Sequence, residues 1–326
     1  MKKIGKLLLI LIGLLLILGG SALAYVKLAL PDVGDTQEIT INADAAMIER
    51  GDYLANHLMV CMDCHSERDW SKFSGPLVPG TLGKGGEVFN HDLGFPGVFL
   101  SKNITPYNLK DWTDGEIMRA ISTGVSKDGE ALFPIMPYSH YGKLDQRDVE
   151  AVIAYLRTLP SIEAEHAQSE ADFPMNFIIN TIPQKAAFGQ RPNPEDKLAY
   201  GEYLMNAAAC YDCHTRQEKG QFVGKDFAGG MEFKLVDGSI VRSSNITPHL
   251  ETGLGNWTEA QFVERFKLYG DSAYIPHEVT KGDFQTIMPW TMYGGLEERD
   301  LKAMFAYLQS LEAVENKVVR FTEPAS

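Results

Sequence analysis

Apolar residues recur at helical spacing near the end of two separate segments of the chain. This i, i+3, i+4, i+7 spacing predicts an amphipathic helix in each segment, with one stripe buried in a core. Thr113 with Glu116, and Thr258 with Gln261, have the form of a capping box, which predicts the start of a further helix upstream of each stripe. Glycine- and proline-rich stretches such as residues 75–86 predict loops between the helices. The stripes are formed by Val149, Val152, Ile153 and Leu156 in the first segment and by Leu301, Met304, Phe305 and Leu308 in the second.

The start of the chain carries three lysines followed by an apolar run from Leu7 to about Val26. About 20 apolar residues suffice for a helix to cross a bilayer, and the basic flank favours a cytoplasmic N-terminus. The sequence SALA at residues 21–24 also fits the cleavage site of a signal peptide, which is the alternative. We favour a membrane anchor in residues 1–30. Both interpretations place the rest of the chain on the periplasmic side.

The remainder of the sequence consists of two matching parts, residues 45–160 and 196–313. SKNITP at 101–106 matches SSNITP at 243–248, and IMPYSHYGKLDQRDVEAVIAYLRTL at 135–159 matches IMPWTMYGGLEERDLKAMFAYLQSL at 287–311. Their order is kept while the loops between them differ in length, which predicts a duplicated, mainly helical domain. Residues 161–195 are expected to connect the two copies, with an apolar patch from Phe173 to Ile182 docked on a domain surface.

The four cysteines of the chain all lie in two C-x-x-C-H motifs, one in each copy. This motif is typical of c-type haem attachment, in which two thiols bond to the porphyrin and the following histidine binds the iron. A zinc ribbon would space its cysteine pairs about 15–20 residues apart, and a thioredoxin-like pair would need a βαβ pattern that is absent here. We therefore expect two haem c groups. Their attachment residues are Cys61, Cys64 and His65 in the first copy and Cys210, Cys213 and His214 in the second.

A methionine stands at the same position of both copies, before a proline and ahead of the last helix. These residues are Met136 and Met288, and the proline stiffens a loop that would hold the sulfur toward the iron. A methionine as sixth ligand raises the potential and suits electron transfer, whereas an open iron face suits substrate binding. We expect Met136 and Met288 to complete the iron coordination with His65 and His214. His140 and Met292, four residues further on, are the second choices.

The NITP motifs place an asparagine and a threonine at matching positions of the two copies. Two interpretations stay open: contact with the haem edge, or the building of a turn. The net charge is -13, with 43 acidic and 30 basic residues, which argues against a nucleic-acid partner. The acidic surface serves solubility or steers a basic protein partner. The motif residues are Asn103, Thr105, Asn245 and Thr247.

Together these motifs resemble the class I cytochrome c domains in cytochrome subunits of periplasmic, membrane-bound alcohol and gluconate-type dehydrogenases. The resemblance covers about residues 45–160 and 196–313. It implies small helical bundles with His/Met-ligated haem, whose first and last helices cross. The chain departs from the family in having two haem motifs where such subunits often have three. A family proline, whose carbonyl orients the proximal imidazole, is matched by Pro76 in the first copy but by Lys225 in the second.

The resulting interpretation is two tandem cytochrome c domains behind one transmembrane helix, held at the inner membrane with the haem domains in the periplasm. Such a chain passes single electrons from a dehydrogenase or quinol-oxidising complex to an oxidase or another cytochrome, and is not itself an enzyme. The alternative is a dihaem redox enzyme, such as a peroxidase or thiosulfate dehydrogenase, which should have unlike distal sites. A sensor is disfavoured because no output segment follows the haem motifs.

Overall fold

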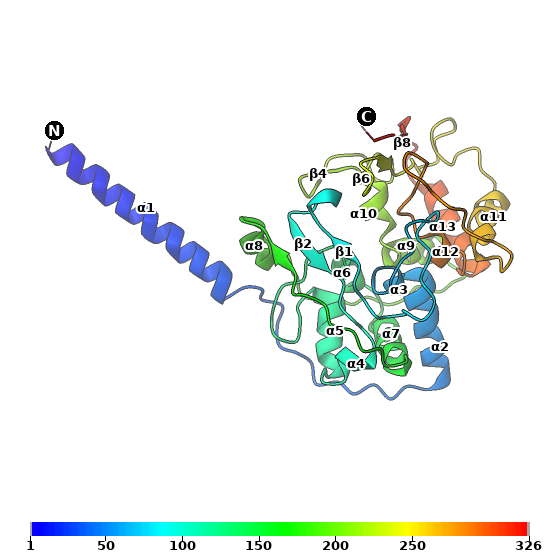
Figure 1. The fold of residues 1–326 in the computed structure, drawn as a ribbon, viewed down its shortest axis with the longest axis horizontal. Helices are drawn as coiled ribbons and strands as arrows, with labels where there is room; N and C mark the ends of the chain where they lie inside the picture. Colours follow the sequence, from blue (N-terminus) through cyan, green and yellow to red (C-terminus); the bar gives the residue numbers. More distant parts are fainter. Residues whose placement is uncertain (1, 325–326) are drawn as a thin grey trace.

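Helix α1 (Lys2–Leu28) projects away from the rest of the chain in the computed structural model, which describes residues 2–324 (Figure 1). Its 27 residues extend over about 40 Å, more than a bilayer's hydrocarbon core. Within the described chain it is the one helix long and apolar enough to cross a membrane, and none of that apolar stretch is buried. The apolar run predicted at the N-terminus is therefore helical. A signal sequence has the same properties, so membrane insertion stays a prediction.

Helices dominate the two parts that follow, here called the first half (residues 45–160) and the second half (residues 196–313). The first half contains α2 (Ala45–Tyr53), the π-helical turn η1 (Leu54–Leu58), α3 (Cys61–Cys64), β1 (Val88–Phe89), η2 (His91–Leu93), β2 (Gly97–Leu100), α4 (Pro106–Leu109), α5 (Asp114–Thr123), α6 (Tyr138–Tyr141) and α7 (Gln146–Thr158). The second half and the tail contain α9 (Lys197–Ala207), α10 (Cys210–His214), β4 (Gln217–Glu218), β5 (Gln221–Phe222), β6 (Glu232–Lys234), β7 (Ile240–Arg242), α11 (Glu259–Gly270), α12 (Trp290–Tyr293), α13 (Glu298–Ser310) and β8 (Phe321–Thr322).

The first and last helices of each half cross at a glycine. A Cβ added to Gly51 in α2 would lie 1.9 Å from the Ala151 carbonyl oxygen in α7. A Cβ added to Gly201 in α9 would lie 2.1 Å from the Ala303 carbonyl oxygen in α13. Only glycine permits so close an approach, and the same crossing occurs in both halves. Each predicted capping box is also formed, at the start of α5 and of α11.

Short strands fasten the connection and the C-terminal tail to the two halves. In the first sheet β2 pairs with β1 and with β3 (Glu170–Ala171) of the connection, and in another sheet β7 pairs with β6 and with β8. The connection is thus docked through β3. Its apolar patch is docked only in part: Phe173 is 79% exposed, whereas α8 (Met175–Ile178) contacts both β3 and α1. The expectation that this patch covers a domain surface was wrong for Phe173.

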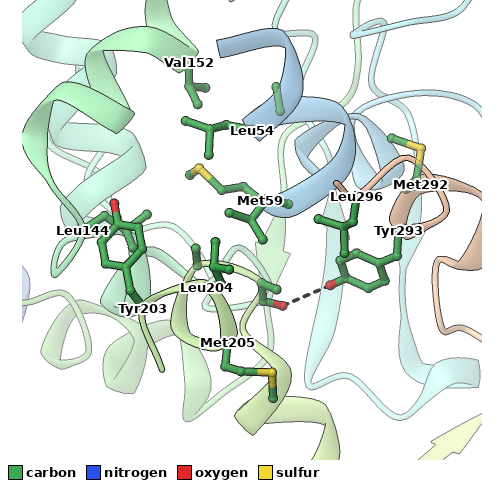
Figure 2. Close-up of a cluster of buried hydrophobic side chains, with 14 of the residues drawn as sticks. Leu54, Met59, Leu144, Val152, Tyr203, Leu204, Met205, Met292, Tyr293 and Leu296 are labelled. Carbon is green, nitrogen blue, oxygen red and sulfur yellow. Dashed lines mark hydrogen bonds between the residues drawn. The ribbon is translucent and has the colours of Figure 1, made fainter. Parts of the chain in front are cut away.

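Buried side chains of the two halves form one hydrophobic core. Leu54 and Met59 from the first half belong to the same cluster as Leu204, Met205 and Leu296 from the second (Figure 2). Leu54, Leu204 and Leu296 are fully buried. Because the cluster continues from one half into the other, the halves are packed as a single body.

Candidate functional site

Each C-x-x-C-H motif begins with a sharp backbone turn. Val60 (φ 45°) and Ala209 (φ 48°), the residues before the first cysteines, both take the left-handed conformation that non-glycine residues rarely adopt. The turn starts the short helices α3 and α10, which carry the cysteines. The same strained turn in both halves indicates that the positions of the thiols are constrained.

The four cysteines are free, and none forms a disulfide. Burial raises the pKa of all four thiols to about 12. A thioredoxin-like pair requires a lowered thiol pKa, so this alternative has no support. Within residues 2–324, no three His, Cys, Asp or Glu side chains are grouped as metal ligands, so a zinc site has no support either.

The two motif histidines are held in the same way. His65 Nδ1 lies 2.7 Å from the Lys102 carbonyl oxygen, and His214 Nδ1 lies 2.8 Å from that of Ser244. Burial lowers the pKa of both imidazoles and outweighs these hydrogen bonds, so the neutral form is favoured. A neutral ring that donates from Nδ1 keeps the lone pair of Nε2 available for a metal.

The carbonyls that orient the imidazoles differ from those expected. The first candidate, the Pro76 carbonyl, accepts a hydrogen bond from Asp69 N (2.9 Å) instead. Lys102 and Ser244 escaped sequence reasoning because they act through the backbone. Their only signal was position, since each directly precedes an NITP motif.

The methionine loops also share their conformation. The amide of Tyr138 donates to the Met136 carbonyl (2.8 Å), and that of Trp290 donates to the Met288 carbonyl (2.8 Å). Pro137 and Pro289 between them have nearly the same dihedral angles, with φ -80° in each case and ψ 54° and 66°. Two unlike distal sites are therefore not indicated by the backbone.

A tyrosine ties each methionine segment to the cysteine motif of its own half. Tyr141 Oη donates to the Met59 carbonyl (2.9 Å), two residues before Cys61. Tyr293 Oη donates to the Ala208 carbonyl (3.0 Å), two residues before Cys210, as drawn in Figure 2. Each candidate distal segment is thus joined by a buried bond to its candidate attachment motif.

His140, the second-choice ligand, is engaged elsewhere. Its Nδ1 lies 2.7 Å from Asn206 Oδ1 and its Nε2 lies 2.8 Å from Asp212 Oδ1, both in the second half. Burial opposes the charged form, but the hydrogen bond and charge of Asp212 together with the hydrogen bond to Asn206 outweigh it and raise the pKa of His140. The Met292 carbonyl likewise lies 2.9 Å from His57 Nδ1 across the halves. These positions connect the halves.

The NITP motifs build turns. Asn103 Oδ1 accepts from Thr105 N and Oγ1 at 2.9 and 2.7 Å, while its Nδ2 donates to the Ile162 carbonyl at 2.8 Å. Asn245 repeats this pattern with Thr247 and the Val314 carbonyl. The turn interpretation therefore agrees with the structure. Each asparagine also fixes the chain that leaves the last helix of its half.

Two tyrosine–aspartate contacts join the halves reciprocally. Tyr53 Oη donates to Asp300 Oδ2 (2.7 Å), and Tyr203 Oη donates to Asp148 Oδ2 (2.6 Å). Tyr53 and Tyr203 occupy matching positions in α2 and α9, and the two aspartates match in α7 and α13. Both carboxylates are buried. Each half thus supplies the hydroxyl that the acid of the other half needs.

Comparison with known proteins identifies a domain in the second half. The cytochrome c family model matches residues 198–312. The chain contains a cytochrome c domain. Over 313 residues it is 28% identical to the cytochrome c subunit of a quinone-type alcohol dehydrogenase from Komagataeibacter europaeus, an alignment that covers 90% of this chain and 61% of the relative.

Other cytochrome c relatives give the same result. The gluconate 2-dehydrogenase cytochrome c subunit of Pantoea cypripedii is 27% identical over 300 residues, 86% of this chain and 63% of the relative. A dihaem cytochrome c-type protein of Cereibacter sphaeroides is 24% identical over 271 residues, 78% of this chain and 83% of the relative. The expected kinship with cytochrome c subunits of dehydrogenases is confirmed. The chain spans under two thirds of the length of those dehydrogenase subunits.

The cytochrome c domain implies covalently bound haem c, and the residues fit that group. Free thiols three positions apart are available for thioether bonds, and a neutral histidine with an available Nε2 follows them. In the first half the buried hydroxyl of Tyr138, two residues after Met136, has no hydrogen-bond partner within the protein. A buried polar group without a partner is uncommon and is consistent with a further group at this position.

Proposed function

We propose that the chain is a dihaem electron-transfer cytochrome in which each half is a cytochrome c domain carrying one haem. The observation that carries this proposal is the matched geometry of the halves: the same left-handed turn, the same imidazole-to-carbonyl bond and the same Met-Pro loop. Cys61, Cys64 and His65 would hold the first haem. Cys210, Cys213 and His214 would hold the second.

In this proposal Met136 and Met288 complete the iron coordination. When bound, haem iron supplies the one-electron redox change, and a thioether ligand raises its potential. The Lys102 and Ser244 carbonyls orient the imidazoles. The Tyr141 and Tyr293 hydroxyls hold the methionine segments to the motifs, so that little rearrangement accompanies a change of charge.

The partner class follows from the relatives. Because several relatives are cytochrome subunits of dehydrogenases, we infer that a dehydrogenase delivers electrons to this chain and that an oxidase or a soluble cytochrome removes them. Helix α1 would hold the haem domains on the periplasmic side of the inner membrane. The acidic net charge would favour docking of a partner through a basic surface.

Haem counting and two methionine variants test the proposal. Pyridine haemochrome analysis of the purified full chain should give two haems per polypeptide that acid acetone does not extract. Met136→Ala and Met288→Ala should each keep both haems, abolish the sulfur-to-iron charge-transfer band of one oxidised haem, and allow that haem to bind carbon monoxide. A parent protein that binds carbon monoxide rapidly at one haem would favour the dihaem enzyme instead.

A further inference from the structure

A loop of the first half is buried against the methionine segment of the second half. We call residues 70–75 the Ser74 loop and residues 285–290 the Met288 segment. Ser74 Oγ donates to the Met288 carbonyl (2.6 Å) and accepts from the Trp290 amide (3.1 Å). The Ser74 amide donates to Gln285 Oε1 (2.8 Å), and Ser74 is 1% exposed. The Ser74 hydroxyl thus bonds to the backbone on both sides of Pro289.

Further contacts hold the Ser74 loop to the second half. Gln285 Nε2 donates to the carbonyls of Lys72 (2.9 Å) and Trp70 (3.3 Å). The Phe73 amide donates to the His277 carbonyl (2.9 Å), and the two rings stack with centroids 4.9 Å apart. Because backbone groups supply most of these bonds, the position of the loop is tightly fixed.

The same loop is bonded to the first cysteine motif. Arg68 Nη1 donates to Asp63 Oδ2 (2.8 Å), and Asp63 stands between Cys61 and Cys64. Arg68 Nη2 and Nε donate to the carbonyls of Ser74 and Gly75, both at 3.0 Å. The arginine side chain is 6% exposed. A continuous bonded path therefore runs from the first motif through Arg68 and Ser74 to Met288.

The contacts in the opposite direction are different: Asp212, which stands between Cys210 and Cys213, bonds to His140 (2.8 Å), four residues beyond Met136. The loop after the cysteine motif is shorter in the second half. The Val223 amide donates to the Arg216 carbonyl (3.0 Å) as the Val78 amide donates to the Glu67 carbonyl (2.8 Å), so Val223 matches Val78 and the described second half has no counterpart of the Ser74 loop. Across residues 2–324, the Met136 carbonyl accepts only the local bond from the Tyr138 amide. The two otherwise similar sites thus differ in what holds their methionine loops.

Ser74 has a strained backbone conformation. Its φ of 66° lies in the left-handed region, where glycine would be more comfortable and a Cβ is costly. A serine here exchanges that strain for two hydrogen bonds to the Met288 segment.

We propose that Ser74 is a positioning residue for Met288, so that the first half fixes the distal side of the second haem site. This inference rests on the proposed function, because it takes Met288 as an iron ligand. Loss of the hydroxyl leaves the Met288 carbonyl and the Trp290 amide with only their bond to each other, and the loop then samples positions in which the sulfur is off the iron. The first haem site is unaffected.

The test uses Ser74→Ala and Ser74→Gly in the full haem-loaded chain. Alanine removes only the hydroxyl. Glycine removes it and also relieves the backbone strain, so it should fold even if the alanine variant does not. The sulfur-to-iron charge-transfer band and carbon monoxide binding report on ligation independently of electron-transfer activity. We expect the fraction of the second haem open to carbon monoxide to rise about ten- to a hundredfold, the effect of two lost hydrogen bonds of ordinary strength.

Two controls separate this role from general loosening. Ser122→Ala removes a buried serine hydroxyl that bonds only within its own helix, to the Met118 carbonyl. Tyr53→Phe removes two other bonds between the halves, the one to Asp300 and the one from the Glu297 amide. Both should leave the two haems unchanged. If Tyr53→Phe opens the second haem as far as the Ser74 variants do, the specific role of Ser74 is refuted.

The failure of this inference is distinguishable from failure of the proposed function. If Met288→Ala abolishes one band while Ser74→Gly leaves both bands intact, the inference fails and Met288 remains a ligand. If Met288→Ala leaves both bands intact, the ligand assignment itself fails, and the inference fails with it.

Discussion

Replacing Gly201 with alanine should destabilise the protein although alanine is the better helix former. In a helix without close neighbours the exchange favours folding by up to about 1 kcal/mol. Here the added Cβ would lie 2.1 Å from the Ala303 carbonyl oxygen and 2.9 Å from the Tyr307 Cβ. Neither is the end of a flexible side chain, so α9 and α13 must separate. Overpacking costs about 1–3 kcal/mol, and contact with a fixed carbonyl places this site at the upper end, which leaves a net loss of about 2 kcal/mol.

Urea unfolding of the full haem-loaded chain in detergent micelles measures this loss. With a slope of about 2 kcal/mol per M, the midpoint should fall by about 1 M. Glu202→Ala changes the neighbouring, exposed position of α9 and should alter the unfolding free energy by less than about 0.5 kcal/mol. A Gly201→Ala midpoint at or above that of the parent would refute the close crossing of the helices.

Two further substitutions test other parts of the structure. Asn245→Ala removes the hydrogen bonds to Thr247 and to the Val314 carbonyl. Because buried partners are left unpaired, the free energy of unfolding measured in urea should fall by about 2–3 kcal/mol. A loss below about 0.5 kcal/mol would contradict this reasoning. His140→Gln should lower the free energy of unfolding most at acid pH, because the pKa of His140 is raised in the folded protein. The stabilisation by the charged imidazole is complete below the unfolded pKa of about 6.5 and is lost as pH rises through the folded pKa. Unfolding curves across that range should show the gap between parent and variant shrinking as pH rises, and a constant gap would disprove the charge contribution.

Features that depend on residues close together in sequence were predicted well. Local residue spacing predicted the capping boxes at Thr113 and Thr258 and the helices at 146–158 and 298–310, because this spacing can be read directly from the sequence. Matching positions between the halves also identified Met136 and Met288 as an equivalent pair. These inferences need no knowledge of how the halves pack.

Contacts made by backbone groups or between distant segments could not be predicted. Lys102 orients His65 through a carbonyl, which every residue possesses, so its identity carries no signal. Ser74 and Met288 are 214 positions apart, and nothing local distinguishes Ser74 from an ordinary loop serine. His140 matched a methionine in the repeat and suggested a ligand, whereas its surroundings make it a bridge to Asn206 and Asp212.

The reciprocal contacts of Tyr53 with Asp300 and of Tyr203 with Asp148 have the form of an isologous interface. Two identical chains that meet across a twofold axis make every contact twice, and here both copies of the contact occur within one polypeptide. The fused chain therefore carries the equivalent of a homodimer interface. A substitution of either tyrosine removes a hydrogen bond from an aspartate of the opposite half. The two halves are therefore constrained to vary together.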